Sequence, residues 1–175
     1  MKPEFLLNVS DYARAARAKL PRDVSDYYEG GALDEVTLRE NTVGWTRLKL
    51  YYRVLTGVAT RDLNTTVLGQ SVSMPILVAP TAFHRLACEA GEIATARAAK
   101  AAGTLFVLSS LSNTAMESVF AQAGSPRWFQ LYIYKDQTIT RELVQRAEAA
   151  GAEAIVLTVD APGLGTRESS QAPSF

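Results

Sequence analysis

Short apolar runs alternate with helix-forming segments from residue 74 onward, a pattern typical of a parallel α/β sheet. The first run, Ile76–Ala79, holds no polar residue, which indicates a strand buried on both faces. Further runs follow at Leu105–Leu108, Trp128–Phe129 and Ile155–Leu157. Because a helical segment separates each run from the next, the pattern predicts about four consecutive βα units.

The segments between these runs contain separate helix signals. Glu89–Ala102 is rich in alanine and closes at Gly103, and Thr114–Glu117 has the spacing of a capping box. A third helix is indicated by apolar and small residues at helical spacing, namely Ile139, Leu143, Ala147 and Ala150. Strands and helices that alternate through right-handed crossovers form a parallel sheet wrapped by helices.

The first 73 residues lack this alternation. Helices are predicted over residues 10–20 with Ser10 as the cap, from Pro21 to Gly30, and from Asp34, which we expect to cap the third helix. Residues 45–73 mix β-forming and turn residues, which predicts irregular edge strands. The predicted organisation is a helical collar and β segment over 1–73, the βα units over 74–168, and a tail over 169–175.

Composition and charge restrict the class of partner. The 175 residues are 47% hydrophobic and 21% charged, as expected for one folded domain with its own core. Eighteen basic residues balance eighteen acidic ones, which argues against nucleic acid or an anionic membrane as partner. The composition therefore favours a small neutral or weakly charged ligand.

Cysteine usage and hydropathy predict a cytoplasmic protein. Cys88 is the only cysteine, which excludes an internal disulfide and a cysteine-based zinc site, so we predict no metal centre. The first residues lack the apolar core of a secretory signal, and no apolar stretch of about 18 residues is present to span a bilayer.

Polar residues follow each apolar run and predict a ligand site. Pro80 ends the first run and leaves the backbone of Thr81 and Ala82 at the carboxyl end of that strand. The later runs lead into Ser109, Gln130 and Thr158. The carboxyl ends of parallel strands meet at one edge of a sheet, where ligands bind. Gln130 needs a hydrogen-bond partner if it is buried, whereas Ser109 and Thr158 could also bond only to local backbone.

Several motifs occur in a fixed order along the chain, at Asp26–Tyr28, Ala79–Ala82, Gly91–Arg97, Leu108–Ser110, Phe129–Tyr132 and Leu157–Asp160, followed by Arg167. In order and spacing they resemble the amino-terminal half of the FMN-dependent 2-hydroxy acid oxidases and dehydrogenases, a family that includes glycolate oxidase and flavin-type lactate dehydrogenase. The resemblance implies a partial (β/α)8 TIM barrel, with FMN at the carboxyl ends of its strands. It also implies oxidation of a small (S)-2-hydroxy acid to a 2-oxo acid.

The resemblance also implies a role for each site residue. The backbone of Pro80, Thr81 and Ala82 would lie against the flavin near its reactive nitrogen, and Ser109, Gln130 and Thr158 would bind the polar edge of its ring. Tyr27 and Arg167 would hold the substrate carboxylate, and Tyr132 would bind the substrate hydroxyl as the catalytic residue. These residue types suit the chemistry, because a guanidinium can clamp a carboxylate with two hydrogen bonds.

The chain also departs from the family pattern. The catalytic histidine, a lysine near the flavin and the phosphate-binding motifs of the family lie beyond the middle of its barrel and have no counterpart here. Leu111 and Ala87–Cys88 stand where other residues are common, and His84, the only histidine, does not match the catalytic position.

The expected product is therefore a half-barrel that is inactive alone. One alternative is a non-catalytic half that pairs with itself, as a homo-oligomer, or with a complementary half, because a half-barrel has unpaired strand edges. The other is a truncated gene product without function. Peroxisomal residence is implied only by some relatives.

Overall fold

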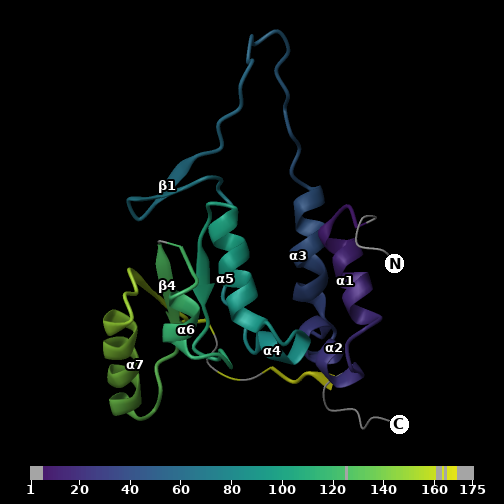
Figure 1. The fold of residues 1–175 in the computed structure, drawn as a ribbon. Helices are drawn as coiled ribbons and strands as arrows, with labels where there is room; N and C mark the ends of the chain where they lie inside the picture. The colour runs from purple at the N-terminus through teal and green to yellow at the C-terminus, as the bar shows by residue number, and fades with distance from the viewer. Residues whose placement is uncertain (1–5, 125, 161–162, 164, 169–175) are drawn as a thin grey trace. The chain divides into compact units, whose positions relative to one another are not determined.

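The chain packs as two units in a computed structural model, which describes residues 6–124, 126–160, 163 and 165–168 (Figure 1). One unit comprises Met1–Gly57 together with Gly163–Phe175, and the other comprises Val58–Pro162. The boundaries expected at residues 73 and 168 remain predictions. None of the helices in the described part of the chain combines the length and the apolar content needed to cross a membrane.

Three helices lie where they were predicted in residues 6–57 of the first unit, but the first begins earlier than expected. The helices are α1 (Val9–Arg17), α2 (Arg22–Glu29) and α3 (Val36–Thr46). Asn8, not Ser10, caps α1, because the Asn8 side chain accepts a hydrogen bond of 2.9 Å from the backbone N–H of Asp11. The expectation for Ser10 was wrong because two cap-forming residues lie close together and the earlier one closes the first turn.

The predicted cap of α3 was also wrong. Glu35, not Asp34, occupies the cap position, with a left-handed φ of 55° and no side-chain cap hydrogen bond. The Glu35 carboxylate instead accepts a 2.9 Å hydrogen bond from the backbone N–H of Gly31. This bond closes the loop between α2 and α3, which fixes the start of α3 without a cap from Asp34.

Residues 45–73 form less strand than predicted. Only a short hairpin is present, made of β1 (Thr65–Val67) and β2 (Gln70–Val72). Between α3 and β1, residues 48–64 form no helix or strand, and Leu50 and Tyr51 are almost fully exposed at 98% and 99%. β-forming residues do not make a strand where no neighbouring strand satisfies their backbone.

The second unit is built on a parallel sheet with the order β3 (Phe106–Leu108), β4 (Arg127–Leu131) and β5 (Ala154–Leu157). The helices that alternate with its strands are α4 (His84–Ala87), α5 (Gly91–Ala101), α6 (Met116–Phe120) and α7 (Gln137–Ala149). The alternation of strand and helix predicted from the apolar runs is therefore present over these residues.

Ile76–Ala79 is not the fully buried strand that its composition predicted. Val78 makes a single parallel bridge with Phe106 of β3, and Ile76 is 68% exposed. The backbone N–H of Val78 donates to Leu105 O at 2.9 Å, and that of Val107 donates to Val78 O at 3.0 Å. Proline on both sides, at positions 75 and 80, removes two ladder donors and limits the segment to this bridge.

The sheet separates two apolar clusters. Phe106 and Leu108 belong to the cluster that also contains buried residues of α5, α6 and α7, here called the helix-side cluster. Leu105 and Val107 belong to the other cluster, together with Trp128 and Val72 of the β1–β2 hairpin. Because successive strand side chains point to opposite faces, the helices cover one face and the second cluster occupies the other.

The β1–β2 hairpin lies at the amino ends of the parallel strands. The Trp128 indole N–H donates to Gln70 Oε1 at 2.7 Å, and Gln70 Nε2 donates to Glu153 Oε2 at 3.0 Å. Trp128 and Glu153 lie near the starts of β4 and β5. The hairpin therefore covers the amino ends of the strands. Their carboxyl ends, on the opposite side of the sheet, remain open for a site.

The capping box predicted at Thr114–Glu117 does not form. Ala115 occupies the cap position of α6 without a side-chain hydrogen bond. Thr114 Oγ1 donates to Glu92 Oε2 at 2.7 Å, and Glu117 accepts two hydrogen bonds from Arg146. Both side chains of the expected box are therefore used by partners distant in sequence.

The Glu117–Arg146 pair should make stability depend on pH. Hydrogen bonds of 2.6 and 2.7 Å from the Arg146 guanidinium are the main reason that the pKa of Glu117 is lowered to about 2. A lowered carboxyl pKa contributes stability above the ordinary value of 4.5, and this stability is lost as the pH falls through about 2. We expect Glu117→Gln to lower the urea midpoint at pH 7, by a modest amount because both side chains are half exposed.

The difference between the wild type and Glu117→Gln should shrink as the pH falls from 4.5 towards 2. Glu142→Gln, on an exposed position of α7, serves as the control and should change the midpoint little at either pH. A Glu117→Gln difference that stays constant over this pH range would rule out the ion pair as its cause.

Candidate functional site

Three of the predicted site residues form one hydrogen-bonded group, here called the strand-end row: Ser109, Gln130 and Thr158. Ser109 follows β3, Gln130 lies near the end of β4, and Thr158 follows β5. Gln130 Oε1 accepts from Ser109 Oγ at 3.3 Å, and Gln130 Nε2 donates to Thr158 Oγ1 at 2.9 Å. The row therefore crosses three neighbouring parallel strands at their carboxyl edge.

Strand register and burial explain how the strand-end row forms. Gln130 is only 2% exposed, so its amide needs partners inside the protein. It alternates with Phe129 and Leu131, which belong to the helix-side cluster, and therefore points to the opposite face of the sheet. The parallel register of β4 and β5 places Gln130 beside Val156, two residues before Thr158, so that the two side chains meet.

Ser110 also hydrogen-bonds within the strand-end row, although no role was predicted for it. Its backbone N–H and its hydroxyl donate to Gln130 Oε1 at 3.0 and 3.2 Å. Ser109 Oγ in turn accepts from the backbone N–H of Leu111 at 3.1 Å. Ser109 thus bonds both to local backbone and across the sheet. The adjacent pair of serines after an apolar run was the signal for this second contributor.

The segment Pro80–Ala82 lies at the same edge of the sheet. It follows the bridge between Val78 and β3, and its neighbour Phe83 donates a backbone hydrogen bond of 3.1 Å to Leu111 O. Thr81 is exposed, whereas Pro80 and Ala82 are partly buried. The structure therefore brings this backbone beside the loop that contains Ser109.

Tyr132 follows the end of β4, two residues after Gln130, and is partly buried. Within the described residues its hydroxyl has no hydrogen-bond partner. The phenol is therefore available to a ligand close to the carboxyl end of β4.

Tyr27 and Arg167 meet in the first unit although they are far apart in sequence. Arg167 Nη1 donates to the backbone O of Tyr27 at 3.1 Å, and the guanidinium carbon lies 5.6 Å from the centre of the Tyr27 ring. The backbone N–H of Leu33 donates to Thr166 O at 3.0 Å, which holds the residue before Arg167 against the loop between α2 and α3. Arg167 also lines a cavity of about 560 Å³ beside the start of α3. Both members of this pair belong to the first unit, and the strand-end row belongs to the second.

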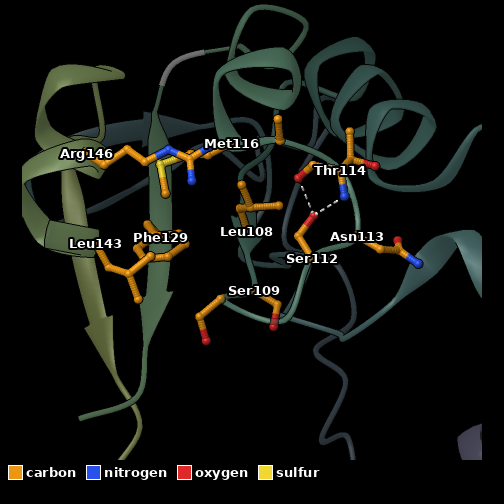
Figure 2. A pocket seen from close by; sticks show the side chains of 11 residues that line it. Leu108, Ser109, Ser112, Asn113, Thr114, Met116, Phe129, Leu143 and Arg146 are labelled. Carbon is orange, nitrogen blue, oxygen red and sulfur yellow. Dashed lines mark hydrogen bonds between the residues drawn. The ribbon is translucent and has the colours of Figure 1, made fainter. Parts of the chain in front are cut away.

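A smaller cavity of about 290 Å³ lies between the helix-covered face of the sheet and the helices α6 and α7, and Ser109 of the strand-end row is one of its lining residues (Figure 2). Leu108, Phe129 and Met116 contribute apolar walls, and Ser112 and Thr114 contribute polar ones. The polar groups already bind one another, because Ser112 Oγ donates to Thr114 O at 2.8 Å and accepts from Thr114 N at 3.1 Å. Nothing in this cavity points to a ligand of its own.

His84 has structural contacts. Its Nδ1 lies 3.1 Å from Thr95 Oγ1 of α5, and its ring centre lies 5.8 Å from that of Phe106. Its Nε2 is buried and has no hydrogen-bond partner among the described residues. The ring is therefore packed between α5 and β3, as expected for a structural histidine.

Comparisons with known proteins connect this geometry to one family. The sequence profile described as FMN-dependent dehydrogenase matches residues 16–175. Glycolate oxidase 3 of Oryza sativa subsp. japonica is 49% identical over 166 residues, which are 95% of this chain and 45% of that protein. Glycolate oxidase of Spinacia oleracea is 48% identical over 164 residues, which are 94% of this chain and 44% of that protein. The chain thus spans less than half the length of these relatives.

Two solved structures also match almost the whole of this chain and about half of their own length. A mandelate oxidase variant with (S)-mandelic acid matches with a TM-score of 0.88 at 37% identity, over 93% of this chain and 48% of the other. The flavin-binding domain of baker's yeast flavocytochrome b2 matches with a TM-score of 0.92 at 33% identity, over 97% of this chain and 45% of the other.

Proposed function

Since the chain belongs to the FMN-dependent dehydrogenase family, we propose that it is the amino-terminal half of an enzyme that oxidises an (S)-2-hydroxy acid to a 2-oxo acid. The family resemblance predicted from the motifs is confirmed, and FMN is the cofactor of that family. One observation supports the proposal most strongly, namely the strand-end row, which gathers amide and hydroxyl groups from three strands at one edge.

We propose that the second unit is about half of a (β/α)8 barrel. Val78 bridges to β3, and β3, β4 and β5 follow as parallel neighbours, with helices on one face and an apolar cluster on the other. Among the described residues, the far side of β5 has no strand neighbour. A closed barrel of eight strands leaves no free edge, so about four more strands would complete it.

The residues at the carboxyl edge fit the ring of FMN. Gln130 and the two hydroxyls of the strand-end row match the hydrogen-bonding edge of the isoalloxazine, and the backbone of Pro80–Ala82 lies at the same sheet edge. When bound, FMN would accept the two electrons that the substrate loses. The phosphate of a barrel ligand usually binds after strands seven and eight, which lie outside these four βα units.

Arg167, Tyr27 and Tyr132 are the proposed substrate contacts of this chain. Arg167 gives one N–H to Tyr27 O, and a guanidinium has five N–H groups, so within the described residues others remain for the substrate carboxylate. Tyr132 would donate to the substrate hydroxyl. A general base within hydrogen-bond reach accelerates proton removal by roughly 10² to 10⁴. The family's catalytic histidine has no match in this chain, so we expect the chain alone to be inactive.

A flavin titration tests the proposed cofactor site. The chain is expected to quench the fluorescence of FMN and riboflavin with Kd values equal to within about twofold, because the phosphate site belongs to the other half. Gln130→Leu removes the hydrogen-bonding amide of the strand-end row and should raise both Kd values by about tenfold or more. Gln145→Leu, on an exposed position of α7, is the matched control and should leave both unchanged.

Anaerobic addition of glycolate or lactate to this mixture should leave the flavin absorbance unchanged. Bleaching would show that the chain is active alone and would refute its proposed inactivity. If the wild type quenches neither flavin, the strand-end row is not a flavin site.

A non-catalytic half-barrel that pairs with a second copy or with a complementary half is the second candidate. Ile155 and Leu157 on β5 are 40% and 48% exposed, which is unusual for apolar residues of a parallel strand. This exposure favours a partner that covers the two side chains. A folded monomer in solution would count against pairing. A truncated product without function is the remaining alternative, and the cytoplasm stays our proposed compartment.

A further inference from the structure

Glu92 is a carboxylate in the second unit to which the proposed function assigns no role. It lies in the first turn of α5 and is 0% exposed. Its Oε1 accepts hydrogen bonds from the backbone N–H groups of His84 at 3.2 Å and Asn113 at 3.3 Å, and its Oε2 accepts from Thr114 Oγ1 at 2.7 Å. One buried side chain thus binds two different loops.

The two loops are those that contain proposed flavin contacts. His84 is the first residue of α4, where the loop of Thr81 and Ala82 after the Val78 bridge ends, and Asn113 and Thr114 follow Ser109 in the loop after β3. The loops are also joined directly, through Phe83 N to Leu111 O at 3.1 Å and Arg85 N to Asn113 Oδ1 at 3.2 Å. Glu92 is the one side chain among the described residues that hydrogen-bonds to both loops.

Local backbone geometry places Glu92 between these loops. Gly91 precedes it with a left-handed φ of 47°, and a Cβ atom at Gly91 would clash with the side chain of Arg85. Glycine at this position therefore lets the start of α5 approach α4 closely. This approach brings the Glu92 carboxylate within reach of both loops.

The carboxylate is held in its ionised form. Burial raises the pKa of Glu92, but hydrogen bonds from Thr114, from its own backbone, and from the backbones of Asn113 and His84 lower it by more, so the net pKa lies below the ordinary value. A buried carboxylate with donors on both oxygens is costly to disturb, because removing it leaves those donors unsatisfied.

We infer that Glu92 is a positioning residue that holds the loop of Thr81–Ala82 and the loop of Ser109–Thr114 at a fixed separation. This part of the inference does not depend on the proposed function. Its consequence, that the flavin cradle is formed before the ring arrives, rests on the proposed function. Pre-formed contacts favour binding because their ordering cost is met during folding.

Amide hydrogen exchange on the chain tests this inference. Glu92→Ala should speed exchange of residues 81–85 and 109–114 by about tenfold, while β4 and α7 stay unchanged. Glu92→Gln keeps an acceptor oxygen for the two backbone N–H groups and should restore most of the protection. Glu142→Gln, a loss of an exposed carboxylate on α7, is the matched control and should not loosen either loop.

Each other outcome has a definite meaning. Unchanged loops in Glu92→Ala, equal acceleration throughout the unit, or no recovery in Glu92→Gln would overturn the inference. If Glu92→Ala does not fold, Thr114→Val removes only the 2.7 Å bond at similar volume. It should speed exchange in residues 109–114 alone by about threefold, and an unchanged loop there would likewise overturn it.

Flavin quenching with the same variants separates this inference from the proposed function. Glu92→Ala should raise the Kd for riboflavin by about tenfold, and Glu92→Gln should recover most of the affinity. Faster exchange in both loops with an unchanged Kd for riboflavin would show that Glu92 does not pre-form the flavin contacts. If the wild type binds no flavin, the proposed function fails, and the exchange measurement still decides whether Glu92 fixes the loops.

Discussion

Co-expression of this chain with the unmatched carboxyl-terminal part of a glycolate oxidase is expected to give a flavin-containing complex that oxidises glycolate. The complex should be at least about 10²-fold faster than the chain alone, because the second half supplies the general base. The chain would contribute the strand-end row, Tyr27, Tyr132 and Arg167. Anaerobic flavin reduction and oxygen consumption measure the reaction, and light scattering measures the mass of the complex.

The exposed side of β5 explains why the halves should associate. Ile155 and Leu157 would become buried when further strands and helices cover them, and the unpaired backbone edge of β5 would gain a ladder. Glu142→Gln, on an exposed position of α7, is a control that should assemble normally. A complex that binds flavin but oxidises no hydroxy acid would contradict the proposed reaction. A chain that stays a folded monomer would contradict the proposed pairing.

Leu108→Ala is expected to have the largest effect on stability. Leu108 is 1% exposed in β3 and packs in the helix-side cluster with Phe129, Val119 and Phe120. Truncation of a buried leucine to alanine costs about 2–5 kcal/mol, through lost burial and the cavity that remains. Since small domains are stable by about 5–15 kcal/mol, this loss is a large fraction of the total stability. Because Leu108 precedes Ser109, the strand-end row should loosen as well.

Urea unfolding followed by tryptophan fluorescence measures this loss, since Trp128 is 7% exposed inside the second unit. Leu111→Ala is the matched control, three residues further on, where the leucine is 37% exposed. It should cost less than about 1 kcal/mol. Equal losses in the two variants would show that Leu108 does not support the core as described.

The parts of the fold that depend on local pattern could be predicted from sequence. Apolar runs separated by helical segments gave β3, β4, β5 and the helices between them, and the polar residue after each run gave the members of the strand-end row. The predictions of strands and helices succeeded because strand burial and helix amphipathicity depend on neighbouring residues. The use of the strand-end row as a ligand site stays a prediction. The roles of Tyr27, Tyr132 and Arg167 came from family resemblance and remain predictions.

The features that failed depend on partners far away in sequence. Thr114 and Glu117 have the spacing of a capping box, yet Glu92 binds the first and Arg146 binds the second. Asp34 lost its expected cap position to Glu35, whose carboxylate bonds to Gly31. Sequence patterns indicate which local structures are possible, and tertiary contacts decide which of them forms. The role of Glu92 was not predicted because its partners are distant in sequence.

The hydrogen bonds of the strand-end row all run in one direction. The backbone N–H of Leu111 donates to Ser109 Oγ, Ser109 Oγ donates to Gln130 Oε1, and Gln130 Nε2 donates to Thr158 Oγ1. Within the described residues the Thr158 hydroxyl donates to nothing further, so its proton and the second amide proton of Gln130 are left over. Bonds aligned in this way polarise one another. A flavin seated here would meet protons along its edge, which favours its electron-rich form and raises its midpoint potential.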